Sequence, residues 1–366
     1  MNRAPQSWAP PFCPNPKCRF HNGDTTLWRH KKIGFYDRKT SPYRIQRRKC
    51  DSCRRSFGVS TFLPTYWLHR PELLRPVFHR LIGCSGIRQI ASEFKASPET
   101  IARMAGRLGR HCLLYHQLHR PRGPVIEPLA ADSFESFEFS QYHPTSFHVA
   151  AGQRSHFFYG FTDSEKRRSG TMKKKQRRKR AELEATLGRP DPRAVEHDFA
   201  HLLATVAPTA QELELHTDRH KDYPRAIRRV GHLKVVHHTV SSRAERTADN
   251  PLFPINLLDL LIRHGSSNHK RETISYSKRR ACAAERLAIF LVWRNWMRPY
   301  SIRRKGKTPA MRLGVANRKI DFEDLFDQRY FPSRIDLPQR WKEYYGKAVK
   351  TRALPRGRVH ALKYAA

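Results

Sequence analysis

Apolar residues recur at intervals of three and four over residues 66–119, and this spacing predicts helices that each bury one face. The clearest run holds Leu73, Leu74, Val77, Phe78, Leu81 and Ile82. A shorter helix follows, whose buried face holds Ile87, Ile90, Ala91 and Phe94. The pattern therefore predicts a helical region near the start of the chain.

The junction after the short helix has the residues of a tight turn. Residues 95–97 form this turn, with Ser97 as the N-cap of the next helix and Pro98 as its first residue. We expect that helix to cover residues 98–108. Such a pair predicts a helix-turn-helix whose second helix enters the major groove of DNA, although similar pairs also occur as ordinary core elements.

The pattern changes after a proline-rich joint at residues 119–128. Strands are predicted at 129–139, 145–151, 155–162, 211–216 and 233–240, from β-branched and aromatic residues between turn residues. Helices are predicted at 195–206, 223–230, 257–263 and 279–297. Three strands followed by alternating helices and strands are the order of an RNase H-like mixed sheet, so the expected fold is multidomain α/β.

The third and fourth strands are separated by a strongly basic run at residues 164–194, which ends in a helical stretch. Its ordinary interpretation is a flexible surface loop. Lys173, Lys174 and Arg178 would also suit contacts with phosphate groups.

Charge adds to this picture. The 366 residues include 71 Lys and Arg against 32 Asp and Glu, which gives a net charge of +39. Such an excess suits a polyanionic partner. The chain has no apolar run long enough to span a bilayer and no signal peptide at its start, so we expect no membrane partner and a cytoplasmic, nucleoid-associated protein in a prokaryote.

Four cysteines occur as two close pairs, Cys13 with Cys18 and Cys50 with Cys53. Four thiolates on two turns can surround one structural zinc ion. The segment between the pairs is basic with interspersed aromatic residues, as expected for a zinc ribbon lying on phosphates. Two unrelated pairs or a disulfide framework are the alternatives.

With these elements in order, the chain resembles insertion-sequence transposases of the DDE type. The resemblance rests on LAADSFE at the first strand, LHTDRHKDYP after the fourth, NLLDLLIRHGSSNHKRETISYSK at a later helix and TPAMRLG at 308–314. It covers residues 13–314. It implies an RNase H-like catalytic domain in which three carboxylates bind two divalent metal ions and cut and join DNA strands.

The chemistry points to two of these acids. Cleavage of a phosphodiester needs an activated oxygen nucleophile and a stabilised leaving oxygen, and two Mg²⁺ (or Mn²⁺) ions held by carboxylates provide both. Asp132 and Asp218 are the first candidates, with Glu135 and Asp222 as local rivals. The nearby histidines 216, 220, 237 and 238 are poor Mg²⁺ ligands, so phosphate or structural roles are expected for them.

The third acid follows from the resemblance. Related transposases show Glu, then Asn, then Arg on one helix face, and the same spacing here holds Asn256, Asp259 and Arg263. Asp259 would complete the metal site, with Asn256 and Arg263 in supporting roles. An ordinary Asp259–Arg263 helix pair is the alternative, and Glu272 and Glu285 are rivals.

The expected organisation is a zinc ribbon at 1–63, a helix-turn-helix domain at 64–120, a catalytic domain at 125–315 and a basic C-terminal extension at 316–366. Double-stranded DNA, as element ends and target, is the expected partner, bound by a homodimer or higher oligomer. The expected DNA contacts are Arg88, Thr100, Arg103, Arg107, Arg110, Lys173, Lys174 and Arg178.

Two functions remain open from the sequence. One is a metal-dependent transposase, from which a plain nuclease would differ only in its products. The other is a non-catalytic, sequence-specific DNA-binding protein, such as a regulator or a degenerate transposase.

Overall fold

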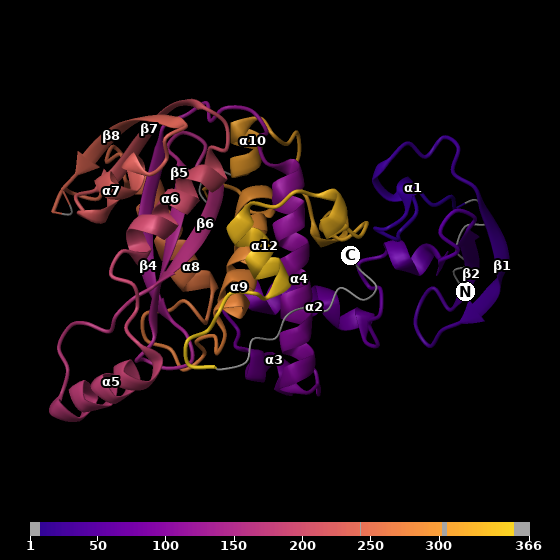
Figure 1. Ribbon diagram of the computed structural model, residues 1–366, viewed down its shortest axis with the longest axis horizontal. Helices are drawn as coiled ribbons and strands as arrows, with labels where there is room; N and C mark the ends of the chain where they lie inside the picture. The colour runs from indigo at the N-terminus through magenta and orange to yellow at the C-terminus, as the bar shows by residue number, and fades with distance from the viewer. Residues whose placement is uncertain (1–7, 242, 302–305, 355–366) are drawn as a thin grey trace.

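The computed structural model describes residues 8–241, 243–301 and 306–354 of the chain. It contains two separate sheets, of three and five strands. The small sheet lies at one end of an elongated molecule and the large one at the other, with a bundle of helices between them (Figure 1). The fold is therefore mixed α/β, as expected.

The small sheet follows a short helix, α1 (Arg19–Asn22). Its antiparallel strands are β1 (His30–Asp37), β2 (Arg44–Cys50) and β3 (Ser56–Phe57), in that order. Most side chains of β1 are exposed. The sheet has a small core of its own, built from Cys13, Cys18, Phe20, Cys50 and Phe57.

The helical region begins with two 3-10 turns, η1 (Val59–Phe62) and η2 (Pro71–Leu73), and continues as α2 (Leu74–Ile82), α3 (Ile87–Glu93) and α4 (Pro98–His119). The predicted N-cap is confirmed, because the hydroxyl oxygen of Ser97 accepts the N–H of Thr100 at 3.1 Å. Helix α4 is longer than expected. Its apolar positions continue through Cys112 and Tyr115, which are buried.

The large sheet has the strand order β6-β5-β4-β7-β8. Strands β4 (Leu129–Phe137), β5 (Pro144–Gly152) and β6 (Phe158–Glu165) are antiparallel neighbours, whereas β7 (Gln211–Asp218) and β8 (Leu233–Val240) continue the sheet parallel to β4. All five predicted strands are present. The third begins three residues later than predicted, because Ser155 remains in the preceding turn through hydrogen bonds to the Glu127 carboxylate.

Helices cover both faces of this sheet. Helix α6 (Ala194–Val206) packs on β5 and β6 and contacts α7 (Asp222–Arg228), whereas α8 (Phe253–Gly265) packs on β4 and β5. Neighbouring strand residues point to opposite faces. His148 contacts Phe199 of α6, and Phe147 contacts His269 just beyond α8, so these helices lie on opposite faces.

Two further helices differ sharply in their packing. Helix α9 (Arg280–Val292), which ends in a π-helical turn, Trp293–Met297, packs against α4 and is almost entirely buried. Helix α5 (Lys174–Leu187) projects from the body (Figure 1), and none of its residues is buried. The basic insertion is thus a solvent-exposed helix rather than only a loop.

The C-terminal part contains α10 (Pro309–Leu313), α11 (Phe322–Leu325), η4 (Pro332–Arg334) and α12 (Gln339–Gly346). Trp341 is fully buried, and its indole N–H donates to the carbonyl of Phe161 at 2.9 Å. One hydrophobic core extends from Leu73 to Val349. The expected C-terminal extension is therefore packed into the body over residues 316–354, and its last twelve residues lie outside the described part.

Candidate functional site

Two turns bring the four paired cysteines together. Cys13 and Cys18 flank the turn before α1, whereas Cys50 ends β2 and Cys53 follows in the next turn. Their sulfur atoms all lie within 4.8 Å of one another. The distances between sulfurs are 3.6 Å for Cys13–Cys53 and 3.9 Å for Cys18–Cys50, so these are free thiols and not disulfides. The cluster could bind a metal ion such as zinc.

The surroundings of the cluster suit a cation. The Trp28 indole N–H donates to the sulfur of Cys50 at 3.3 Å. Burial raises the pKa of the Cys13 and Cys18 thiols. Four thiolates so close together repel one another, and a bound cation removes that repulsion.

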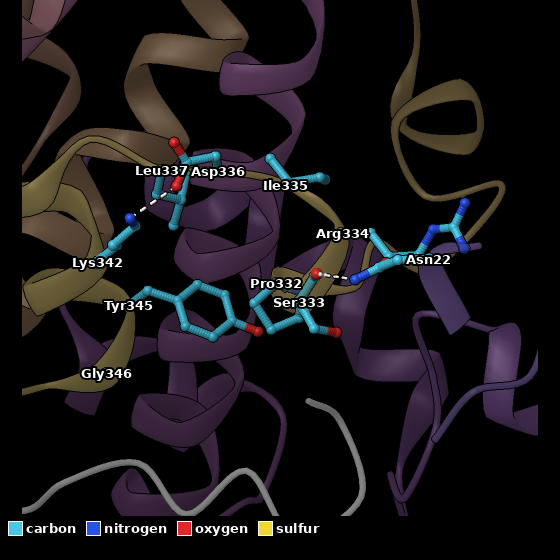
Figure 2. Close-up of a pocket in the computed structure, with 10 residues that line it drawn as sticks. All are labelled: Asn22, Pro332, Ser333, Arg334, Ile335, Asp336, Leu337, Lys342, Tyr345 and Gly346. Atoms are coloured by element: carbon cyan, nitrogen blue, oxygen red, sulfur yellow. Dashed lines mark hydrogen bonds and ion pairs between the residues drawn. The ribbon is translucent and has the colours of Figure 1, made fainter. Parts of the chain in front are cut away.

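The four cysteines and the small sheet belong to residues 8–63, here called the cysteine module. This module contacts the segment at residues 331–334 of the C-terminal part. His21 bonds the Ser333 hydroxyl through Nε2 at 2.7 Å and the Cys13 carbonyl through Nδ1, also at 2.7 Å. The Asn22 side chain donates to the carbonyl of Ser333 at 3.1 Å, at the edge of a cavity of about 590 Å³ (Figure 2). The Arg334 guanidinium lies 3.8 Å from the centre of the Phe12 ring. The module is therefore held by specific contacts to residues more than 300 positions away.

In the large sheet, two aspartates lie on adjacent parallel strands. Leu129 pairs with Leu215 and Ala130 with His216. Asp132 of β4 and Asp218 at the end of β7 each lie two residues beyond this last pair, and the charge of Asp218 acts on Asp132. Both point to the face of Ala130, because side chains two residues apart on a strand share a face.

A third aspartate comes from the helix over that face. Phe134 shares the face of Asp132, and the Arg263 guanidinium of α8 lies 5.6 Å from the centre of its ring. Nε of Arg263 lies 3.1 Å from both carboxylate oxygens of Asp259. The ordinary helix pair that the sequence left open is thus present, on the helix that covers Asp132.

The three acids interact electrostatically. Burial raises the pKa of Asp132 to about 6, and the negative charges of Asp218 and Asp259 add to the rise. Tyr223 of α7 directs its hydroxyl at Asp132 across 3.4 Å, and its own pKa is raised by burial and by the charge of Asp132. The sequence interpretation missed Tyr223, although it follows the second acid in the motif DRHKDYP.

Within the described residues, the carboxylate oxygens of the three acids do not all lie within 4.8 Å of one another. The expected close convergence of all three is therefore not seen. Two metal ions about 3.5–4 Å apart need only one carboxylate between them, with the others on either side. Of the three acids, Asp132 is the one whose pKa is raised by the charges of both of the others.

The rival acids have other partners or positions. Glu135 is exposed and paired with Lys166, and Asp222 is paired with Arg225 at 3.6 Å. Glu285 is buried between α9 and α4, where it bonds Arg110 at 2.9 Å. Glu272 is exposed.

The predicted DNA contacts of the helix-turn-helix divide into two groups. Arg88 and Arg103 are exposed, and Thr100 is partly exposed in the first turn of α4. Arg107 instead donates to the carbonyl of Pro64 at 2.8 Å, and burial lowers its pKa to about 10. Arg110 is paired with the buried Glu285. We therefore correct the expectation for Arg107 and Arg110, whose side chains are directed at the protein itself.

The predicted contacts of the insertion, Lys173, Lys174 and Arg178, are all exposed at the start of α5. Arg178 is paired with Glu182 one turn later, but 85% of its side chain remains exposed. All three side chains are therefore accessible from solvent.

No model of a protein family matches the chain, and no curated protein matches it either. Among the described residues, no helix is long and apolar enough to cross a membrane. The site must therefore be judged from its own geometry.

Proposed function

We propose that this chain is a DNA transposase of the DDE type, which binds the ends of an insertion sequence and catalyses metal-dependent strand cleavage and strand transfer. The observation that carries the proposal is the placement of Asp132, Asp218 and Asp259. Two acids lie two residues beyond the last pair of adjacent parallel strands, the third is on the helix that packs on the first of these strands, and Asp132 interacts electrostatically with both of the others.

The order of the elements supports the same conclusion. Three antiparallel strands are followed by the helices α5 and α6 and then by two strands parallel to the first, with α7 between them, and the strand order is β6-β5-β4-β7-β8. This is the topology expected of an RNase H-like catalytic domain. The sheet places the acid of its first strand at its centre and the second acid on the adjacent strand.

The acids fit Mg²⁺ or Mn²⁺, which prefer carboxylate oxygens and often need only one or two of them beside water and phosphate. Asp132 and Asp218 would hold these ions, and Asp259 would join them by exchanging its contact with Arg263 for a metal. When bound, the ions would activate the attacking oxygen and stabilise the leaving one. Arg263, released from Asp259, would be free to neutralise a DNA phosphate.

DNA binding is assigned to the parts outside the large sheet. The cysteine module would hold structural zinc and present its basic strands, Arg88, Thr100 and Arg103 would face the groove, and Lys173, Lys174 and Arg178 would contact phosphates. The net charge of +39 suits this polyanion. An assembly of two or more copies on paired element ends is part of the proposal.

The test uses supercoiled plasmid that carries the genomic sequences flanking the gene on both sides. Purified full-length protein is incubated with it in Mg²⁺ or Mn²⁺, and nicked, linear and joined products are separated on gels. We expect cleavage and joining at matching inverted repeats. Asp132→Asn and Asp218→Asn should abolish both while leaving DNA affinity unchanged, and Glu135→Gln, on the same strand, should remain active.

The Asp259–Arg263 pair favours a second candidate, a degenerate relative that only binds DNA, because its third acid is already neutralised. Wild-type protein that binds the flanking repeats but cuts them in neither metal would support this candidate. Cleavage without joined products would indicate a plain nuclease. Cleavage that survives Asp132→Asn would contradict the proposed site altogether.

A further inference from the structure

Two histidines and a glutamate meet on the face of β7 and β8, next to the aspartate site. Glu214 and His216 are two residues apart on β7, and His238 pairs with His216 across the two strands. Residues in these relations point to the same face of a sheet. This is also the face of Asp218, two residues beyond His216.

This part of the sheet is open on that face. Leu213, Leu215 and Thr217 are buried on the opposite side, whereas Glu214 and His238 are exposed. About half of each of these two side chains is accessible. His216 is only 9% exposed. The trio therefore consists of one nearly buried side chain, His216, and two exposed ones, Glu214 and His238.

The distances suit one metal ion. Oε1 of Glu214 lies 2.9 Å from Nε2 of His216 and 3.9 Å from Nε2 of His238. One ligand atom from each of the three lies within 4.8 Å of the others. Ligand atoms about 2.0–2.1 Å from one tetrahedral zinc ion lie about 3.3 Å apart, a spacing between the two distances from Oε1 of Glu214.

The hydrogen bond within the trio uses only one of the two ring nitrogens of His216. Nε2 of His216 contacts Glu214, but its buried Nδ1 has no hydrogen-bond partner among the described residues. The imidazole rings of His216 and His238 are stacked, with centres 4.7 Å apart and planes at 24°. The exposed His238 ring would have to rotate to turn its nitrogen toward an ion.

We propose that Glu214, His216 and His238 form a site for a divalent transition-metal ion of the zinc type, separate from the four cysteines. Two imidazoles and one carboxylate select such an ion over Mg²⁺. Three protein ligands leave the fourth position to water or to a phosphate oxygen. The site does not depend on the proposed catalytic activity, since it uses none of the three aspartates.

The test is the zinc content of full-length protein after equilibrium dialysis against Zn²⁺ in magnesium-free buffer. We expect two ions per chain in the wild type and one in His238→Gln and in Glu214→Gln, with at least a tenfold loss of affinity for the second ion. His237→Gln is the matched control. His237 comes directly before His238 on β8, but it forms a hydrogen bond with Thr217 on the opposite face of the sheet. It should keep two ions.

Cobalt separates the two sites spectroscopically. When Co²⁺ is added to protein whose cysteines already hold zinc, the proposed site should give visible absorption without the intense near-ultraviolet band of thiolate ligands. Circular dichroism checks that each variant is folded. One zinc ion per wild-type chain, or two in both His238→Gln and Glu214→Gln, would overturn the proposal.

Discussion

Replacement of Asp132 by Asn should stabilise the metal-free protein, although it removes one acid of the proposed site. The pKa of Asp132 is raised from an ordinary 3.8 to about 6 by burial and by the neighbouring Asp218 and Asp259. The folded state therefore holds a proton more tightly than the unfolded chain. The difference is worth about 3 kcal/mol, since one pKa unit corresponds to roughly 1.4 kcal/mol.

The sign of the pH dependence follows from this proton. Between about pH 4 and pH 6 the folded wild type binds more protons at Asp132 than the unfolded chain does, so its stability falls as the pH rises through that window. The asparagine side chain of the variant carries no charge at any pH. The variant should thus equal the wild type near pH 4 and exceed it by about 3 kcal/mol at pH 7.5.

Urea unfolding followed by tryptophan fluorescence measures this difference at several pH values in magnesium-free buffer. Chelators are left out, because they would also remove a metal ion from the proposed zinc site at the four cysteines. Glu135→Gln is the control, and its difference from the wild type should remain within about 0.5 kcal/mol at every pH. Added Mg²⁺ should reduce the advantage of Asp132→Asn by stabilising only the wild type. A difference that does not change with pH, or a variant less stable than the wild type at pH 7.5, would refute the electrostatic argument.

Three further predictions concern other parts of the chain. Arg107→Ala should lower the free energy of unfolding by about 1–2 kcal/mol, because the hydrogen bond to the Pro64 carbonyl is lost. Arg103→Ala should change the free energy of unfolding by less than about 0.5 kcal/mol but weaken DNA binding in a gel-shift assay. The opposite pattern would reverse our assignment of these two side chains. Cys50→Ser should lower the zinc content by about one ion per chain, as measured by elemental analysis. The variant should also make the first 63 residues sensitive to protease while the main body resists, because the two parts have separate cores. Arg280→Ala should cost about 3–5 kcal/mol in urea unfolding, because it leaves the carboxylates of Glu138, Asp163 and Glu165 without their shared buried partner. Arg340 also pairs with Asp163, and Arg352 with Glu165, so a loss below about 1 kcal/mol would show that these two arginines compensate for it.

The strands and the junction of α3 and α4 could be predicted because each depends on local residues, and the cysteine cluster could be predicted because its two close pairs are visible in the sequence. β-branched and aromatic residues between turn residues identified the five strands β4 to β8, and Ser97 and Pro98 marked the start of α4. The register that brings Asp132 near Asp218 could not be read from the spacing of 86 residues. It depends on the pairing of β4 with β7, which is a tertiary contact.

The basic residues of α4 show most clearly what the sequence leaves undetermined. Arg103, Arg107 and Arg110 all suit a helix that contacts DNA, and nothing local distinguishes them. Helix α4, however, packs against α9, where Arg110 pairs with the buried Glu285. Close packing of the helices at Gly109, where an added Cβ would collide with the backbone carbonyl of Glu285, fixes this orientation. Arg103 lies about two turns before Arg110 and on nearly the same face of α4, because a helix turns about 100° per residue. Arg103 is exposed near the start of the helix, whereas Arg107 and Arg110 contact Pro64 and Glu285, so it is the elements packed along α4 that decide which of these basic side chains stays exposed.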